Sequence, residues 1–324
     1  MRRTSACLVA GAVLAAAAVP APGRDEGAQT ATHKELPPLK VTFRALSTLR
    51  LTPQGNLLAG DAGTKEIKII SPGGKQTGTI RLPFGPESID VAPDGTIYCG
   101  GQGKLAKLSS DGKALATADM PSLAKMTVQP RRGRTRTQRV SGIAVGGKDL
   151  FVAFGAGWSL RSKSKLVRFD LELKDPKLLA EGIRGCCQRC DIVVRQGVVY
   201  LAENTAHRVV RFDRTGKVLG KWGQRSRTGI EGFGACCNPM NLCFGSDGAL
   251  YTAESGLARI KRYSVSGKLL SLVGYVGTTR FTRASHTAAA CSNIAVDVTA
   301  DGRRVYVMDY ANKIIRVLEK KDPK

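Results

Sequence analysis

The chain repeats one short pattern six times, and this repeat limits the possible folds more than any other feature. Each copy is an apolar segment that follows a glycine-containing turn, and all but the third end in small or acidic residues. The copies start about 40 to 55 residues apart, a spacing typical of propeller repeats. They are Leu57–Asp61, Ile97–Gly101, Leu150–Phe154, Val199–Glu203, Leu250–Glu254 and Val305–Asp309.

Around each copy the sequence predicts further short strands. Asp94-Gly95, Asp247-Gly248 and Asp301-Gly302 precede three of the copies, and Asp-Gly between apolar runs favours a tight hairpin. A basic strand follows each copy, such as Arg208–Phe212, and a Gly-Lys turn leads to a fourth strand, such as Val218–Trp222. Six units of four short antiparallel strands predict an all-β fold, a six-bladed β-propeller.

The two ends of the repeat region predict how the ring closes. The last unit has no fourth strand, because only charged residues remain after Leu318. The segment Lys40–Arg44 reads as a strand that has no unit of its own. We expect this N-terminal strand to be the outer strand of the last blade.

The motifs of the fourth and fifth units resemble those of the NHL-repeat six-bladed β-propeller family, in its exported bacterial type. The matching residues are Gly232-Phe233, Pro239 before Leu242, Asp247-Gly248, Leu250-Tyr251, Arg259–Tyr263, Gly267-Lys268 and His207-Arg208. The resemblance covers about residues 40 to 318 and implies a fold more than a function. One member type, the peptide-amidating lyase, holds zinc with channel histidines. The chain has only 3 histidines, so this activity is not carried over.

The N-terminus has the features of a secretory signal. Arg2-Arg3 precede the apolar run Ala6–Val19, which is shorter than the roughly 20 residues of a transmembrane helix. We expect a signal peptide and short linker over residues 1–31, with cleavage between Ala18 and Ala31. Residues 32–324 then form the propeller. The sequence predicts export to the periplasm or beyond the cell, with no membrane span after signal removal.

The chain is strongly basic, with a formal net charge of +24. Arginines gather in Arg131–Arg136 with Arg139, and a second basic stretch is Arg161–Lys165. Export and an aromatic content of only 6% argue against nucleic acid as the partner. We expect a solvated surface, or contact with an acidic protein or wall polymer.

Six of the 9 cysteines gather at equivalent places, just before the first strands of the last three units. They are Cys186, Cys187 and Cys190 in the fourth unit, Cys236 and Cys237 in the fifth, and Cys291 in the sixth. Asp191, Asn241 and Asn293 follow them at matching positions. The loops before the first strands and after the second strands open on one face, so these residues are expected at one mouth of the channel.

Three interpretations of the six cysteines stay open. Export and an even number of cysteines after signal removal favour structural disulfides. Thiolates also suit zinc, copper or an iron–sulfur cluster, with Asp309 as a further candidate ligand. A redox dithiol helped by Arg189 is the third interpretation. Cys99 and Cys243 lie within strands and are expected to be buried free thiols.

Four acids end the second strands of the same neighbouring units: Asp61, Glu203, Glu254 and Asp309. Short acidic residues at such places often accept backbone amides or pair with the following Arg208, Arg259 or Lys313. Alternatively, Glu203 and Glu254 are candidate catalytic bases at the mouth. His207 is expected only to pack at its strand start, while His286 is a candidate ligand.

The sequence therefore predicts a ligand- or metal-binding propeller with its site at the mouth formed by blades 4, 5, 6 and 1. A protein-interaction scaffold with disulfides only, and a metal-dependent lyase or hydrolase, are the alternatives. Whether the protein is an enzyme, and which substrate it takes, is left open by the sequence.

Overall fold

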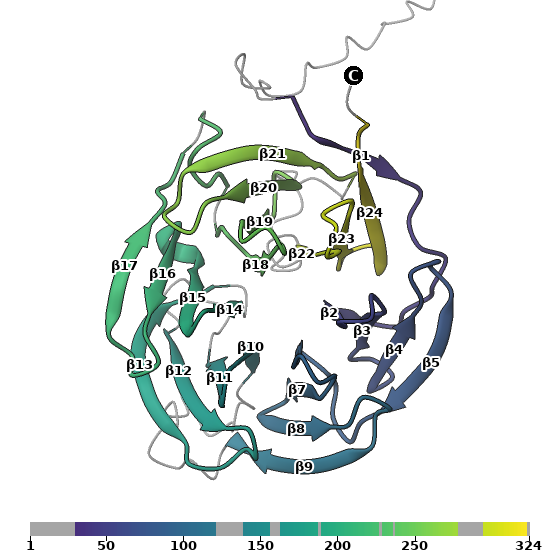
Figure 1. The fold of residues 1–324 in the computed structure, drawn as a ribbon, viewed down its shortest axis with the longest axis vertical. Helices are drawn as coiled ribbons and strands as arrows, with labels where there is room; N and C mark the ends of the chain where they lie inside the picture. Colours follow the sequence, from purple (N-terminus) through teal and green to yellow (C-terminus); the bar gives the residue numbers. More distant parts are fainter. Residues whose placement is uncertain are drawn as a thin grey trace, which may run out of the picture.

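Six four-stranded antiparallel sheets stand around a central axis in the computed structural model (Figure 1). The structure describes residues 30–120, 139–155, 163–186, 189–226, 229–235, 237–277 and 294–322. The predicted six-bladed β-propeller is confirmed. The first strand of each repeat unit lies nearest the centre, and these inner strands contact one another around a closed ring.

The blades follow the repeat units in order, and the first three have the following strands. They are blade 1, β2 (Leu46–Leu51), β3 (Leu57–Asp61), β4 (Glu66–Ile70) and β5 (Gln76–Arg81); blade 2, β6 (Ser88–Val91), β7 (Ile97–Gly101), β8 (Lys104–Leu108) and β9 (Ala114–Asp119); and blade 3, β10 (Val140–Gly146), β11 (Asp149–Phe154), β12 (Lys163–Asp170) and β13 (Lys177–Arg184).

The last three blades complete the ring. They are blade 4, β14 (Ile192–Arg195), β15 (Val198–Glu203), β16 (Arg208–Phe212) and β17 (Val218–Trp222); blade 5, β18 (Asn241–Phe244), β19 (Leu250–Glu254), β20 (Arg259–Tyr263) and β21 (Leu269–Tyr275); and blade 6, β22 (Ile294–Val298), β23 (Arg304–Asp309), β24 (Ile314–Lys320) and β1 (His33–Leu36). A short 3-10 turn, η3 (Asn204–Ala206), joins β15 to β16. In the described part of the chain, no helix has the length and apolar character to cross a membrane.

An N-terminal strand closes the ring, as expected, but it is a different segment from the predicted one. β1 pairs with β24 in an antiparallel register that sets His33 opposite Lys320. The predicted segment Lys40–Arg44 forms no strand. Its side chains Val41 and Phe43 instead pack into the core between blades 6 and 1. The alternation of polar and apolar residues in this segment reflects the burial of its apolar side chains, and its backbone pairs with no strand.

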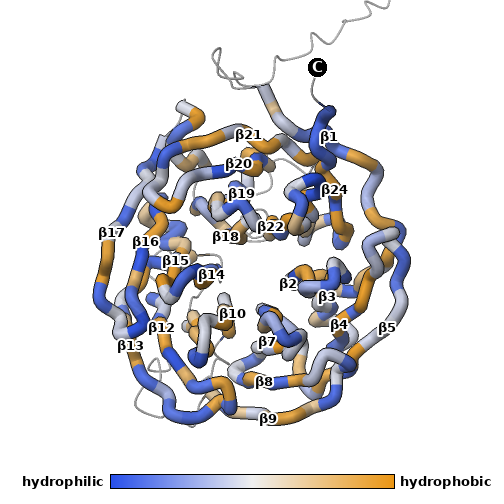
Figure 2. The backbone as a smooth tube through the Cα atoms, viewed as in Figure 1, coloured by the Kyte–Doolittle hydropathy of each residue, from blue (hydrophilic) through white to orange (hydrophobic). Residues whose placement is uncertain are grey.

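The hydrophobic core is divided among the six interfaces between blades. Successive side chains of a strand point to opposite faces of its sheet, so each strand supplies two neighbouring interfaces. In β3, Leu57 packs toward blade 6 and Leu58 packs toward blade 2. Figure 2 shows hydrophobic residues spread around the whole ring. The ring therefore folds as one unit in which every blade needs its neighbours.

The hairpin turns between first and second strands carry glycines in the left-handed region, as the sequence predicted. They are Gly55, Gly95, Gly147, Gly197, Gly248 and Gly302. Because neighbouring strands are antiparallel, these turns lie at one end of the channel, which we call the turn-side mouth. Connections between blades, and from second to third strands, lie at the other end, the loop-side mouth.

Candidate functional site

The described cysteines of the cluster are buried beneath the loop-side mouth. Cys186 and Cys237 belong to one apolar cluster that also contains Met240. Cys190 lies in a different cluster, between blades 3 and 4. Cys187, Cys236 and Cys291 lie outside the described residues. Cys186 and Cys237 thus pack in one buried cluster and Cys190 packs in another.

Asn204 holds the Cys186–Arg189 loop in place. It is fully buried at the start of η3, where its Oδ1 accepts the Cys186 N–H at 3.0 Å. Its Nδ2 donates to the carbonyls of Cys186 and Arg189, at 3.2 and 3.0 Å. One amide side chain therefore satisfies the backbone of a tight loop that would otherwise lack partners.

Cys190 does not have the environment of a reactive thiolate. Cys190 is free and has no exposed surface, and burial raises the pKa of its thiol above the usual range. Among the described residues, no three His, Cys, Asp or Glu side chains lie close enough together to hold a metal ion. A metal site in this region would need at least one residue outside the described ranges, such as Cys187, Cys236, His286 or Cys291. The metal, disulfide and redox interpretations therefore stay predictions.

Cys99 and Cys243 are buried free thiols within strands, as predicted. They belong to clusters on different sides of the ring, one between blades 1 and 2 and the other between blades 5 and 6. Burial raises the pKa of both thiols.

The acids that end the second strands hold local structure. Asp61 accepts the backbone N–H groups of Arg44, Ala45 and Gly63, and these bonds outweigh burial and lower its pKa. Glu203 pairs with Arg208 at 2.5 Å, as the structural alternative expected. Asp309 pairs with Arg316 at 2.8 Å rather than with the expected Lys313.

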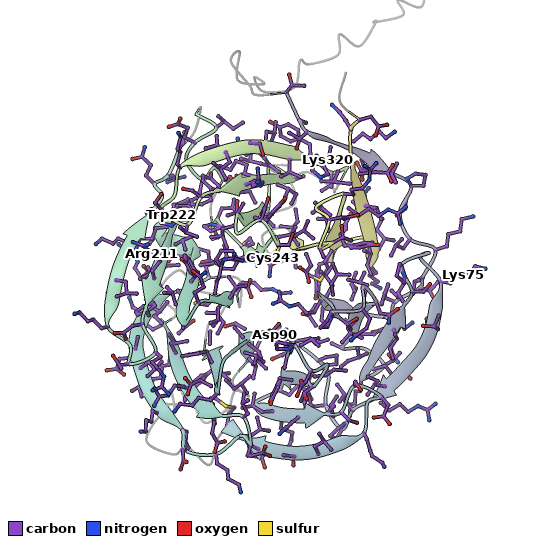
Figure 3. The ribbon with its side chains drawn as sticks, in the orientation of Figure 1. Lys75, Asp90, Arg211, Trp222, Cys243 and Lys320 are labelled. Carbon is purple, nitrogen blue, oxygen red and sulfur yellow. The ribbon has the colours of Figure 1, made fainter. Side chains whose placement is uncertain are left out.

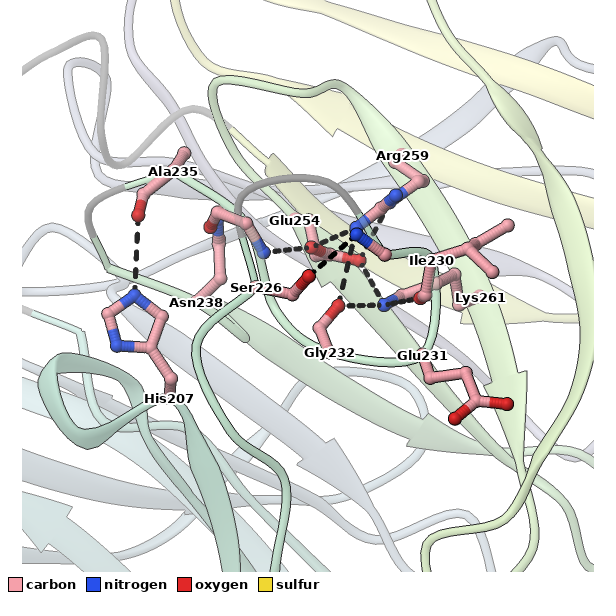
Figure 4. A network of polar contacts seen from close by, with 12 residues as sticks. His207, Ser226, Ile230, Glu231, Gly232, Ala235, Asn238, Glu254, Arg259 and Lys261 are labelled. Atoms are coloured by element: carbon pink, nitrogen blue, oxygen red, sulfur yellow. Dashed lines mark hydrogen bonds and ion pairs between the residues drawn. The ribbon is translucent and has the colours of Figure 1, made fainter. Parts of the chain in front are cut away.

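Glu254 lies at the centre of a buried charged network that ties the loop between blades 4 and 5 to blade 5 (Figure 4). It has no exposed surface. Arg259 donates to both of its oxygens at 3.0 Å, and the Gly234 N–H donates at 2.9 Å. Its candidate role as a catalytic base has no support in this geometry, because each oxygen is already engaged and shielded from solvent.

Lys261 completes this network. Its Nζ lies 2.8 Å from Glu254 Oε1 and donates to the carbonyls of Ile230 and Gly232, at 2.8 and 2.7 Å. It also lies over the Phe233 ring, 4.9 Å from the ring centre. Burial lowers the pKa of Lys261 to about 8 despite the nearby carboxylate. All three ammonium protons therefore have acceptors, which is what a fully buried lysine requires.

His207 packs at the start of its strand, as expected. It adopts a left-handed conformation with φ 54° and is buried, and its Nε2 lies 3.3 Å from the Ala235 carbonyl. Burial lowers its pKa. His286 lies outside the described residues.

Polar side chains of the inner strands join neighbouring blades along the channel wall. Asp191 Oδ2 accepts the Leu242 N–H at 2.8 Å, and Asn241 Oδ1 accepts the Val296 N–H at 2.7 Å. Asn241 also donates to Asp191 at 2.7 Å, which confirms that their matching positions in the repeat meet in space. These bonds satisfy strand-edge amides that face the channel. Asn293 lies outside the described residues.

Arg189 reaches across the loop-side mouth. Its Nη2 donates to the Ser47 carbonyl at 2.9 Å, and Ser47 belongs to blade 1, on the opposite side of the ring from blade 4. This is the only hydrogen bond of the guanidinium to a described residue. The side chain is partly exposed. Burial, and next the charge of Arg139, lower the pKa of Arg189 to about 10. The charges of Asp191 and Glu87 act in the opposite direction but do not outweigh these two effects.

Arg139 lies at the same mouth and pairs with Glu87 at 2.9 Å. Glu87 Oε2 also accepts the Val140 N–H at 2.9 Å. The segment 121–138, which contains the predicted basic stretch Arg131–Arg136, joins β9 to β10 at this end of the ring, and its own structure is outside the described residues.

At the turn-side mouth, Arg50 forms a second charged group with Asp90 and Asp297. Arg50 Nε lies 2.7 Å from Asp90 and 3.9 Å from Asp297. Burial acts to lower the pKa of Arg50, but these carboxylates outweigh it and raise the pKa. Asp90 and Cys243 lie on facing sides of the central opening in Figure 3.

Sequence reasoning missed Arg50, Asp90 and Asp297, although a signal for them exists. Asp90 and Asp297 interrupt otherwise apolar first strands, each four residues before the acid of the following turn. A charge at that position of an innermost strand points into the channel. The signal depends on knowing which strand is innermost.

Comparisons with known proteins agree with the fold. Similar solved structures include a streptogramin B lyase, with 16% identity and a TM-score of 0.56, covering 89% of this chain and 97% of that chain. A calcium-binding regucalcin from Agrobacterium tumefaciens has 14% identity and a TM-score of 0.57, covering 87% and 93%. A luciferin-regenerating enzyme has 12% identity and a TM-score of 0.60, covering 86% and 92%. No protein-family model and no curated protein sequence matches the chain.

At these identities the likeness concerns the fold alone. The neighbours are enzymes or a calcium-binding protein, so a ligand-binding propeller is compatible with them, while function depends on the residues of the site.

Proposed function

We propose that this protein is an exported, NHL-like propeller that binds a small anionic ligand at its loop-side mouth. The observation that carries the proposal is Arg189, which spans the mouth from blade 4 to blade 1 and keeps guanidinium donors unused by the described residues. This is the mouth at which the sequence predicted a site. Arginine, in place of the cysteines and acids, would supply the binding groups.

The charge balance at this mouth supports an anion. Arg139 and Arg189 place two guanidinium groups near each other, and Glu87 is already engaged with Arg139 and with the backbone. A carboxylate or phosphate would accept hydrogen bonds from the Arg189 donors that no described residue uses and would add negative charge beside the two guanidinium groups. Hydrogen bonds between arginine and such anions are among the strongest in proteins.

The proposal is tested by titrating the purified protein with citrate and inorganic phosphate in a calorimeter, with glycerol as an uncharged control. We expect saturable binding of at least one anion. Arg189→Gln should weaken it about ten- to a hundredfold, the usual value of hydrogen bonds to a charged group. Arg81→Gln is the matched control, because the Arg81 side chain is 89% exposed on an outer strand.

Equal anion affinity in Arg189→Gln and wild type would contradict the proposal. Binding of no anion at all would also contradict it and would favour the protein-interaction scaffold. Elemental analysis of the same samples addresses the metal interpretation. One equivalent of zinc, copper or iron that is lost in Cys187→Ser would assign the mouth to a metal instead.

A further inference from the structure

The turn-side mouth contains a pocket of about 330 Å³ that is separate from the site proposed above. Residues from blades 1, 2, 4, 5 and 6 line it, so it lies where the inner strands converge. This volume is at the lower end of the range for small-molecule sites. Another surface depression, near Thr30 and Lys320, lies at the closing seam.

Apolar and polar side chains share the walls of this pocket. Val91, Val194 and Phe244 line it from three different blades and are each only partly covered by their neighbours. Val298 adds a fourth apolar wall from blade 6. Apolar side chains that surround a concave opening favour a ligand with an apolar body, because its binding releases water from both surfaces.

Arg50 supplies the polar end of the pocket. Its Nε is engaged by Asp90 at 2.7 Å. Neither terminal nitrogen of Arg50 makes a hydrogen bond to a described residue, and the side chain is 25% exposed in the pocket lining. The four N–H groups of these two nitrogens are therefore not used by the described residues and can donate to an acceptor on a ligand.

The carboxylates around Arg50 compensate its charge and so favour a neutral ligand at the guanidinium. Asp90 and Asp297 flank the guanidinium at 2.7 and 3.9 Å, with side chains 5% and 8% exposed. An anion at this place would be repelled by the two carboxylates, and a cation would be repelled by the guanidinium. Each repulsion costs binding free energy. A neutral carbonyl oxygen meets neither cost and still accepts hydrogen bonds from the fork.

We infer that the turn-side mouth binds a compact, uncharged ligand whose apolar body fills the valine and phenylalanine walls and whose carbonyl oxygen accepts hydrogen bonds from Arg50. The site differs in chemistry from the loop-side mouth, where Arg189 lacks such flanking carboxylates at hydrogen-bond distance. The inference does not depend on the anion site.

Three probes of similar shape but different charge test whether the pocket prefers a neutral ligand. Benzamide is neutral, benzoate is anionic and benzylammonium is cationic. Ligand-observed NMR on the full protein should show benzamide binding with a dissociation constant on the order of 1 mM, reasonable for so small a molecule. Benzoate and benzylammonium should bind at least about tenfold more weakly, since each carries an uncompensated charge into the pocket.

Two tryptophan variants locate the binding site. Ser246 is an exposed residue of the pocket lining, and Ser246→Trp should abolish benzamide binding by filling the opening. Ser266→Trp is the control, because Ser266 is exposed on the outer turn of the same blade and does not line the pocket. Arg50→Lys keeps the charge but removes the planar fork, and should weaken benzamide severalfold.

Absence of benzamide binding to the wild type, or equal binding to Ser246→Trp, would overturn the inference. Tighter binding of benzoate or benzylammonium than of benzamide would also overturn it. Because Ser246 is exposed, this variant decides the question even if Arg50→Lys fails to fold.

Discussion

Lys261 and Arg189 are both basic residues inside the ring, but their hydrogen-bond partners give them different roles. Lys261 has an acceptor for each of its three protons and no exposed surface, so it stabilises the loop between blades 4 and 5. Arg189 has one acceptor among the described residues and is partly exposed. A half-buried cation with unused donors is available to a ligand, whereas a saturated one is not.

Asp191 is the residue whose charge should make stability depend on pH. Burial raises the pKa of Asp191 from the ordinary 3.8 to about 7. The hydrogen bond from the Leu242 N–H and the charges of Arg50 and Arg189 act to lower this pKa but do not outweigh burial. The folded state therefore holds this proton more tightly than the unfolded state. Its contribution to stability is greatest below about pH 4 and is lost as the pH rises toward about 7.

Asp191→Asn removes this titration and tests it. Between pH 4 and 8, the free energy of unfolding of the wild type should fall relative to that of Asp191→Asn, by on the order of 2–4 kcal/mol. Urea denaturation at a series of pH values measures the difference. Asp322→Asn is the control, since the Asp322 side chain is 87% exposed. Parallel pH profiles for the wild type and Asp191→Asn would refute the prediction.

At the scale of the element, the closing strand shows how a sequence pattern can mislead. The residues 40–44 alternate apolar and polar, and their apolar side chains are indeed buried. Lys68 Nζ donates to the Thr42 carbonyl and lies 5.0 Å from the Phe43 ring centre. The segment thus covers the core between blades 6 and 1, while β1 pairs with β24. Alternation predicts which side chains are buried, but not which backbone they pair with.

Removing β1 should destabilise the whole ring, because every blade depends on its neighbours. A chain that begins at Pro37 loses the β1–β24 pairing and the ion pair of Glu35 with Arg316 at 2.9 Å. We expect its melting temperature to fall by about 5–10 °C. A chain that begins at Thr32 keeps β1 and should melt like the longer chain. Equal melting of both chains in a calorimetric scan would show that β1 does not close the ring.

At the scale of the whole molecule, the ring begins where the predicted signal and linker end. The Thr32 N–H donates to the Leu272 carbonyl at 3.0 Å, and β1 starts at the next residue. Removal of residues up to Ala31 would therefore leave the closing strand intact. Export and ring closure are compatible in the same chain.

The expected signal peptide predicts that the exported protein is shorter than the full chain. Expressed in a bacterium with its own N-terminus, the protein should be recovered from the periplasm or the medium. Intact-mass spectrometry should place the new N-terminus between residues 18 and 31. An Arg2→Glu/Arg3→Glu variant should export less, since the basic start is part of the signal. Full-length protein retained in the cytoplasm would contradict the prediction.

The sequence by itself determined the architecture of this protein. Six spaced hairpin signals specify six blades, because strand alternation and glycine turns are local features that each unit carries independently. It also placed Asp191 and Asn241 at matching positions, and these residues do meet. The sequence anticipated the pair of Glu254 with Arg259, but tertiary structure alone decided the long-range partners. Lys261 donates to the Ile230 and Gly232 carbonyls, Arg189 extends across the channel to Ser47, and Arg50 pairs with Asp90 and Asp297. Such contacts join residues of different blades or of long loops, and their distances depend on how the ring closes, which no local pattern contains.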